Sequence, residues 1–128
     1  MSRSATVLRG LIAVHLVWTF LLTPIALEPR PFSSINPLGY VSLVLIFTVV
    51  ALDIAAFVIV GRNPATAWRL AAVGPFLFVG PFIGDQLGYF ATIAAPTRIT
   101  VLELLAFATQ VAILFVALRI RREVATGS

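Results

Sequence analysis

Four long runs of apolar residues, separated by short polar breaks, make up most of the chain. The runs cover residues 8–27, 38–60, 71–95 and 99–118. Each is close to the roughly 20 residues that an α-helix needs to cross the hydrocarbon core of a bilayer. Polar and apolar residues do not alternate within them, as they do in the strands of a membrane β-barrel. The pattern predicts an all-α fold, an integral membrane four-helix bundle that forms a single domain over residues 1–128.

Proline marks the breaks between the runs and also interrupts the third run. The breaks at 28–37, 61–64 and 95–98 each contain proline, which excludes the helical conformation from the residue before it. Pro75 and Pro81 lie inside the third run, so we expect that helix to be kinked. The first run is too long for the apolar region of a cleaved signal peptide, and we expect it to be retained as a helix.

Composition agrees with a lipid environment. The chain is 60% hydrophobic and 11% charged, whereas a soluble domain carries roughly a quarter charged residues. It has no cysteine, which excludes disulfides, iron–sulfur clusters and thiolate zinc sites. Its net charge of +4 comes from arginines at the ends of apolar runs and not in patches with interleaved aromatics. We therefore expect the lipid bilayer, and not nucleic acid, as the partner.

The arginines are divided unequally between the two sides of the predicted bundle. One side holds seven of them, namely Arg3, Arg9, Arg62, Arg69, Arg119, Arg121 and Arg122. The other side holds only Arg30 and Arg98. Because basic residues concentrate on the cytoplasmic side, we expect an inner (plasma) membrane protein with both termini in the cytoplasm.

Apart from Arg9 near the start of the first run, each apolar run contains one ionisable residue, whose presence there requires an explanation. These residues are His15, Asp53, Asp85 and Glu103. Charged groups inside a membrane are costly and generally face the interior of a bundle. At about 1.5 Å per residue, His15 and Asp53 lie at matched depth near the cytoplasmic side, and Asp85 and Glu103 lie in the outer half. We expect two polar tiers in a shared interior.

The outer tier carries the groups that acid–base chemistry needs. Two nearby carboxyl groups in a dry interior tend to share one proton, so Asp85 and Glu103 are candidates for catalytic acid and base. His15 beside Asp53 would form an ion pair or a proton relay and completes the catalytic candidates. Hydrogen bonds that only hold the helices together are the structural alternative for these residues. For Glu103, about one turn from the outer boundary, a side chain that reaches toward the membrane interface is a further alternative.

Four further residues are candidates for contacting a substrate. Gln86 and Tyr89 lie close to Asp85 in sequence, where they would orient a bound molecule. Gln110 lies near the middle of the fourth run, and Trp18 lies one turn from His15, where a core or lipid-facing position is the favoured alternative. No helix carries a Glu-x-x-His or His-x-x-x-His pair, so we expect neither a metal nor another cofactor.

Glycine recurs at every fourth position of the third run, at Gly80, Gly84 and Gly88. On a helix this spacing puts the three on one face, which allows another helix to pack closely. That partner helix could belong to the same chain or to a second copy in a homodimer.

Three functions remain open. The first, which we favour, is an enzyme that acts on a lipophilic small molecule by isomerisation, cyclisation or hydration, using the carboxyl pair. The second is a proton-coupled transporter or channel that works as a homodimer, with both tiers as proton stations. The third is an accessory subunit of a membrane complex. A pocket that ends at Asp85 and Glu103 would favour the enzyme, and a water path joining both tiers would favour transport.

Overall fold

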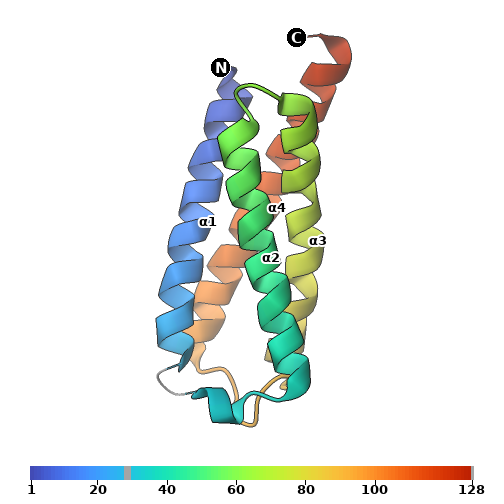
Figure 1. Ribbon diagram of the computed structural model, residues 1–128. Helices are drawn as coiled ribbons and strands as arrows, with labels where there is room; N and C mark the ends of the chain where they lie inside the picture. The colour runs from blue at the N-terminus through green and yellow to red at the C-terminus, as the bar shows by residue number, and fades with distance from the viewer. Residues whose placement is uncertain (28–29, 128) are drawn as a thin grey trace.

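The computed structural model describes residues 1–27 and 30–127, which form a bundle of four long helices (Figure 1). The helices are α1 (Arg3–Leu27), α2 (Pro37–Ile59), α3 (Pro64–Gln86) and α4 (Thr97–Thr126), with a short 3-10 helix, η1 (Phe32–Ser34), before α2. Each of the four is long and apolar enough to cross a membrane. The predicted all-α membrane bundle is confirmed at this level.

The third helix lies earlier in the sequence than expected. It begins at Pro64, where the Asn63 side chain accepts a hydrogen bond from the backbone N–H of Thr66. It ends at Gln86 and not near residue 95, because Gly88 follows with a positive φ of 79° that breaks the helical path. Residues 87–95 are apolar enough to resemble a continuing span but form a loop. The kink expected at the prolines inside α3 stays a prediction.

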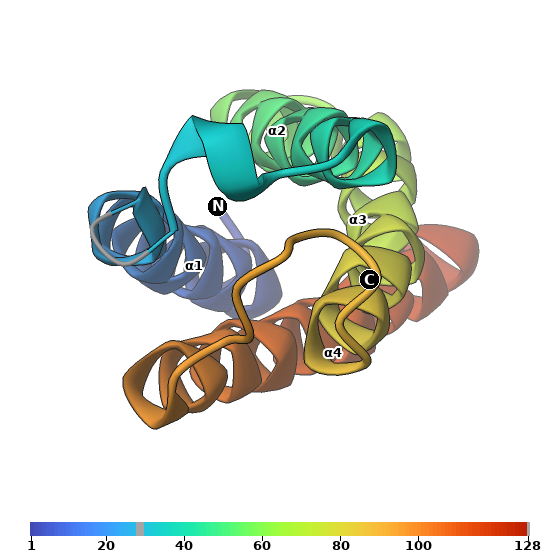
Figure 2. The ribbon, with the colours of Figure 1, turned by 90° about the horizontal axis from the view of Figure 1, so that it is seen from below.

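The helices pack in a ring that is loosely closed on one side. α1 packs along α4, α4 along α3, and α3 along α2, whereas α1 and α2 touch only sparsely (Figure 2). Both chain ends and the turn at 61–63 lie at one end of the bundle, here called the termini end (Figure 1). The segments 30–36 and 87–96 lie at the opposite end, here called the loop end.

Hydrogen bonds join the two segments of the loop end. The N–H of Asn36 donates to Phe90 O at 3.0 Å, and the N–H of Thr92 donates to Ser34 O at 2.9 Å. Asn36 also begins α2, since its side-chain oxygen accepts from the N–H of Gly39. A Cβ at Gly39 would lie 2.3 Å from Phe90 O, so α2 and the second segment meet backbone to backbone. The loop end is thus one connected structure.

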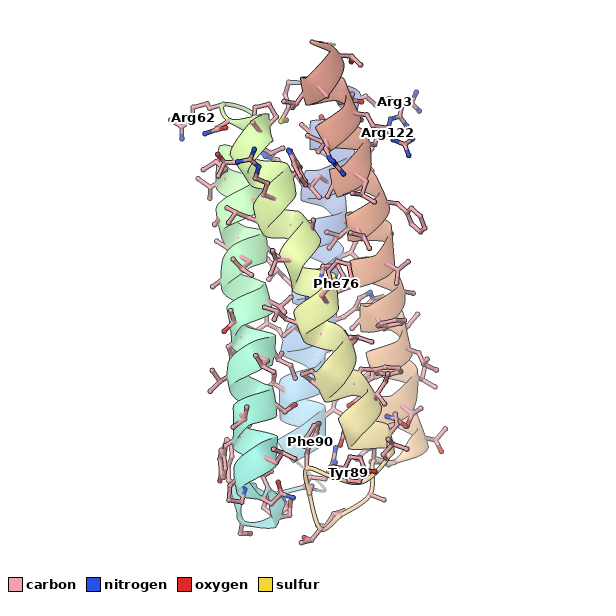
Figure 3. The ribbon with its side chains drawn as sticks, turned by 90° about the vertical axis from the view of Figure 1, so that its right-hand side faces the viewer. Arg3, Arg62, Phe76, Tyr89, Phe90 and Arg122 are labelled. Atoms are coloured by element: carbon pink, nitrogen blue, oxygen red, sulfur yellow. The ribbon has the colours of Figure 1, made fainter. Side chains whose placement is uncertain are left out.

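The two halves of the bundle interior are filled differently. Toward the termini end, Leu8, Ile12, Ile113 and Ile120 are fully or almost fully buried and form the main apolar core. Phe76 instead points away from the bundle at mid-height (Figure 3), with 69% of its surface exposed, as suits a side chain that faces lipid. Toward the loop end the interior contains polar groups and a cavity.

Candidate functional site

A buried cluster of polar side chains lies in the middle of the bundle. This core polar cluster consists of His15 and Thr19 from α1, Asp53 from α2 and Gln110 from α4. Nε2 of Gln110 donates to Oδ2 of Asp53 at 2.9 Å, and Nε2 of His15 lies 3.9 Å from the same oxygen. The Thr19 hydroxyl is 3.3 Å from Nε2 of His15. The predicted proximity of His15 and Asp53 is confirmed.

Two oxygens of this cluster have no hydrogen-bond partner among the described residues. They are Oδ1 of Asp53 and Oε1 of Gln110, both fully buried. Both face Gly74 of α3, where a Cβ would lie 3.5 Å and 3.1 Å from them, respectively. A larger residue at Gly74 would crowd these groups, so the glycine allows α3 to pack against them.

A second cluster lies at the loop end and centres on an ion pair. Nη1 of Arg30 donates to Oδ2 of Asp85 at 3.1 Å, and Nη2 donates to Oδ1. Nε of Arg30 donates to the Ile93 carbonyl at 3.1 Å. The two charged side chains are only 9% and 12% exposed. The hydrogen bonds to Asp85 raise the pKa of Arg30 above its ordinary value, so the guanidinium stays charged.

Glu103 of α4 extends this loop-end polar cluster. Its carboxyl group lies beside that of Asp85 at the same end of one cavity, and two carboxyl groups so close tend to share one proton. Nε2 of Gln86 donates to Oε2 of Glu103, and the Thr100 hydroxyl donates to Oε1 of Gln86 at 3.1 Å. With Arg30 positive, one shared proton on the two carboxyl groups makes the trio neutral. The arrangement therefore suits proton transfer.

A cavity of about 180 Å³ connects this cluster to the middle of the bundle. It lies on the side where α1 and α2 touch sparsely, and both helices contribute to its wall. Its lining includes Arg30, Asp85 and Glu103 toward the loop end and Thr19 toward the core polar cluster. Most of the surface between them is apolar, as with Phe47. We call it the lateral cavity.

None of the four residues expected to contact a substrate lines this cavity. Gln86 reaches Glu103 from the exposed side of α3. Tyr89, expected beside Asp85, lies instead in the loop that follows α3 and is 60% exposed, because the helix ends at Gln86. Gln110 belongs to the core polar cluster. Trp18 packs, partly buried, against an apolar cluster that includes Phe78.

The three glycines of the third run do not form one packing face, contrary to expectation. Gly88 lies outside α3. Gly84 is covered by Phe90 of the same chain, whose ring would lie 2.2 Å from an added Cβ. Gly80 lies in α3 but contacts no other helix of the described chain, since an added Cβ would meet no atom within 4 Å. A spacing of four does place glycines on one face of a helix, but α3 ends before the third glycine.

Arg30 is the member of the candidate site that the sequence did not predict. It was counted as a loop charge that sets orientation, yet it turns into the bundle and pairs with Asp85. One signal could have found it, because an arginine on the side where arginines are scarce calls for a specific partner. Phe90, which lines the lateral cavity and covers Gly84, carried no such signal.

Within residues 1–27 and 30–127, no group of three or more His, Asp or Glu side chains is arranged to hold a metal ion. Comparison with known proteins gives no family for the chain. No protein-family model, no curated protein and no solved structure matches it.

Proposed function

We propose that this chain is a membrane-embedded enzyme that binds a lipophilic small molecule in the lateral cavity and acts on it by acid–base chemistry. The observation that carries the proposal is a mostly apolar cavity whose loop-end lining includes two adjacent carboxyl groups, Asp85 and Glu103. Apolar walls with a few convergent polar groups are typical of small-molecule sites. The sparse contact of α1 with α2 offers a route of entry from lipid.

The contacts of the two carboxyl groups suggest different roles for them. Asp85 is held by two hydrogen bonds from Arg30, which fix it as a carboxylate. Among the described residues, Glu103 has the neutral Gln86 amide as its further hydrogen-bond partner, so we assign to Glu103 the giving and taking of the proton. Glu103 would protonate one carbon of the substrate, and the same carboxyl pair would accept a proton from another carbon or from water.

The size of the cavity limits the reacting part of the substrate. A cavity of roughly 150 Å³ in an apolar core holds one benzene ring. The lateral cavity, at about 180 Å³, therefore fits one ring with a few added atoms or a short branched chain. A longer molecule would leave the rest of its chain between α1 and α2, in contact with lipid.

Deuterium labelling can test the proposal while the substrate is still unidentified. Isomerisation, cyclisation begun by protonation, and hydration of a double bond each form a new C–H bond with a proton that comes from solvent. Purified protein is incubated in D2O with a lipid extract of the cells from which the sequence comes. Mass spectrometry should find a lipophilic compound with non-exchangeable deuterium, and Glu103→Gln should abolish that label.

Glu123→Gln is the matched control, because this acid lies near the end of α4, far along the helix from the cavity. It should label as the parent protein does. Equal labelling by Glu103→Gln and the parent protein, or no labelled compound from the parent protein, would contradict the enzyme proposal.

Proton-coupled transport is the second candidate, and one contact favours it. Thr19 lines the lateral cavity and its hydroxyl also approaches His15, so it joins the cavity to the core polar cluster. A proton could pass from Glu103 toward Asp53 along such a route. Protein in liposomes with a pH gradient would then carry protons inward, and Asp53→Asn would stop the flux. Parent liposomes that hold the gradient as protein-free liposomes do would contradict this candidate.

For the membrane orientation we propose that the termini end faces the cytoplasm. Seven of the nine arginines belong to that end, and this bias is the usual determinant of orientation. The loop end, with Arg30, Asp85 and Glu103, would then lie toward the outer leaflet.

A further inference from the structure

The termini end carries more positive charge than its own acids can balance. Arg3, Arg62 and Arg122 lie there (Figure 3), together with the four other arginines of that side. Glu123 is the one described acid at this end. Its Oε1 accepts from the Ser4 hydroxyl at 2.6 Å and lies 3.5 Å from Nε of Arg119. No acid among the described residues pairs with Arg69 or Arg121, so both are available to an anion from outside the chain.

Two of these arginines are held at one aromatic ring. Cζ of Arg69 lies 5.6 Å, and Cζ of Arg121 5.5 Å, from the centre of the Trp68 ring. Trp68 is itself partly buried against the main apolar core, which fixes its ring. Arg69 comes from α3 and Arg121 from α4, so the ring gathers cations from two helices. Cation–π attraction opposes the repulsion between the two guanidinium groups.

We propose that Trp68, Arg69 and Arg121 bind the phosphate of an anionic phospholipid headgroup between the ends of α3 and α4. Guanidinium groups offer paired N–H donors that match phosphate oxygens, and stacking on a ring leaves these donors free. Tryptophan prefers the depth of the headgroups, and basic pockets between membrane helices bind anionic headgroups.

The surface next to Arg121 also suits a lipid. A shallow hollow there is lined by Leu118, Arg121, Arg122 and Ala125. Leu118 lies one helical turn from Arg121 toward the middle of the membrane, where it would contact an acyl chain. A free phosphate ion would make no favourable contact with that apolar side chain, whereas a phospholipid would, and this favours a phospholipid as the occupant.

Binding of defined lipids tests the site. Delipidated protein in a neutral detergent is titrated with phosphatidylglycerol and, separately, with phosphatidylcholine, and native mass spectrometry counts the bound lipids. Phosphatidylglycerol should bind at least about tenfold more tightly than phosphatidylcholine. Arg69→Gln and Arg121→Gln should each weaken phosphatidylglycerol binding by about tenfold. Trp68→Phe should keep part of the affinity, and Trp68→Leu should lose it.

Arg62→Gln is the matched control, because Arg62 is an exposed arginine of the same end without a described aromatic partner. It should bind phosphatidylglycerol within about twofold of the parent protein. Equal binding of the two lipids would overturn the proposal, and so would an equal loss with Arg62→Gln, which would indicate diffuse charge. Competition by glycerol phosphate at equal concentration would overturn the lipid assignment in favour of free phosphate. Circular dichroism and the melting temperature without lipid confirm that each variant is folded.

Discussion

Asp85 depends on a charged partner that comes from outside its own helix. Arg30 binds both of its carboxylate oxygens, and the pair is largely withdrawn from the surface. Since Asp85 raises the already high pKa of Arg30, no physiological pH removes the positive charge. A group whose pKa is raised on folding stabilises the folded state at every pH below its unfolded pKa, so the contribution of Arg30 is retained at every pH below the ordinary pKa of arginine. The pair therefore holds the segment at Arg30 against α3 throughout the working range.

Removing Arg30 should destabilise the fold. Arg30→Gln leaves Asp85 buried without its cation, and breaking a buried pair from one side costs about 3 kcal/mol. The free energy of unfolding is measured by denaturant titration in mixed micelles. The double variant Arg30→Gln with Asp85→Asn should recover part of the loss, because no charge is then stranded. Arg62→Gln, in the exposed turn at the opposite end, should change stability by less than about 0.5 kcal/mol. An Arg30→Gln protein as stable as the parent would mean that the pair has no structural role.

At the residue scale, sequence reasoning placed the acids better than their partners. The matched depth of His15 and Asp53 follows from counting residues along two helices, and the two side chains do meet. The same counting predicted that Glu103 lies near Asp85, as it does in the structure. Arg30 escaped it, because the position of a loop side chain depends on tertiary contacts that no helical period encodes.

At the element scale, α3 shows where hydropathy loses information. Residues 87–95 are as apolar as a membrane span, so a hydropathy pattern continues across the point where the helix ends. The helix ends because the backbone at Gly88 adopts a φ of 79°. A hydropathy pattern records which residues are apolar and cannot detect such a backbone conformation. The start of α3 at Pro64 could have been predicted in place of residue 71, since an Asn-Pro pair is a recognisable helix beginning.

Two glycine substitutions should distinguish a glycine required for close packing from a glycine that is merely part of a helix. In Gly39→Ala the new Cβ would lie 2.3 Å from the backbone oxygen of Phe90, so we expect a loss of about 2 kcal/mol in the free energy of unfolding. In Gly80→Ala the Cβ meets no atom within 4 Å, and a helical alanine should stabilise by about 0.5 kcal/mol. Unfolding titrations of both variants give the comparison. Equal effects of the two would show that α2 and the loop at Phe90 do not meet so closely.

For the whole molecule, the count and packing of the spans could be predicted, but the cavity could not. Four apolar runs suffice to predict a bundle, since each helix must satisfy its own backbone in lipid. Which pair of helices stays apart depends on side chains that meet only after folding. The sparse contact of α1 with α2 leaves room for the lateral cavity beside Ser42 and Thr19, and the surface that joins its two polar ends is mostly apolar.

Filling the lateral cavity should block it without unfolding the bundle. Ser42 is buried and lines the cavity, so Ser42→Leu would occupy part of its 180 Å³. A diazirine-bearing octanol added to the parent protein in liposomes should label cavity-lining residues, including Phe47, when illuminated. Peptide mass spectrometry maps the label. Ser42→Leu should remove it, and Thr48→Leu, on the exposed side of the same helix, should not. Label spread evenly over lipid-facing residues in all three proteins would rule out a binding cavity.

The orientation of the whole molecule can be tested with unusual directness, because the chain has no cysteine that would need to be removed. Ser2→Cys puts a thiol on an exposed residue of the termini end, and Ser33→Cys puts one on an exposed residue of the loop end. If the arginine bias sets the topology, a membrane-impermeant maleimide should label Ser33→Cys in intact cells and Ser2→Cys only after lysis. The opposite result would place Arg30, Asp85 and Glu103 toward the cytoplasm, so that the lateral cavity would draw its ligand from the inner leaflet. Labelling of both in intact cells would indicate mixed orientation, and then the arginines alone would not determine the topology.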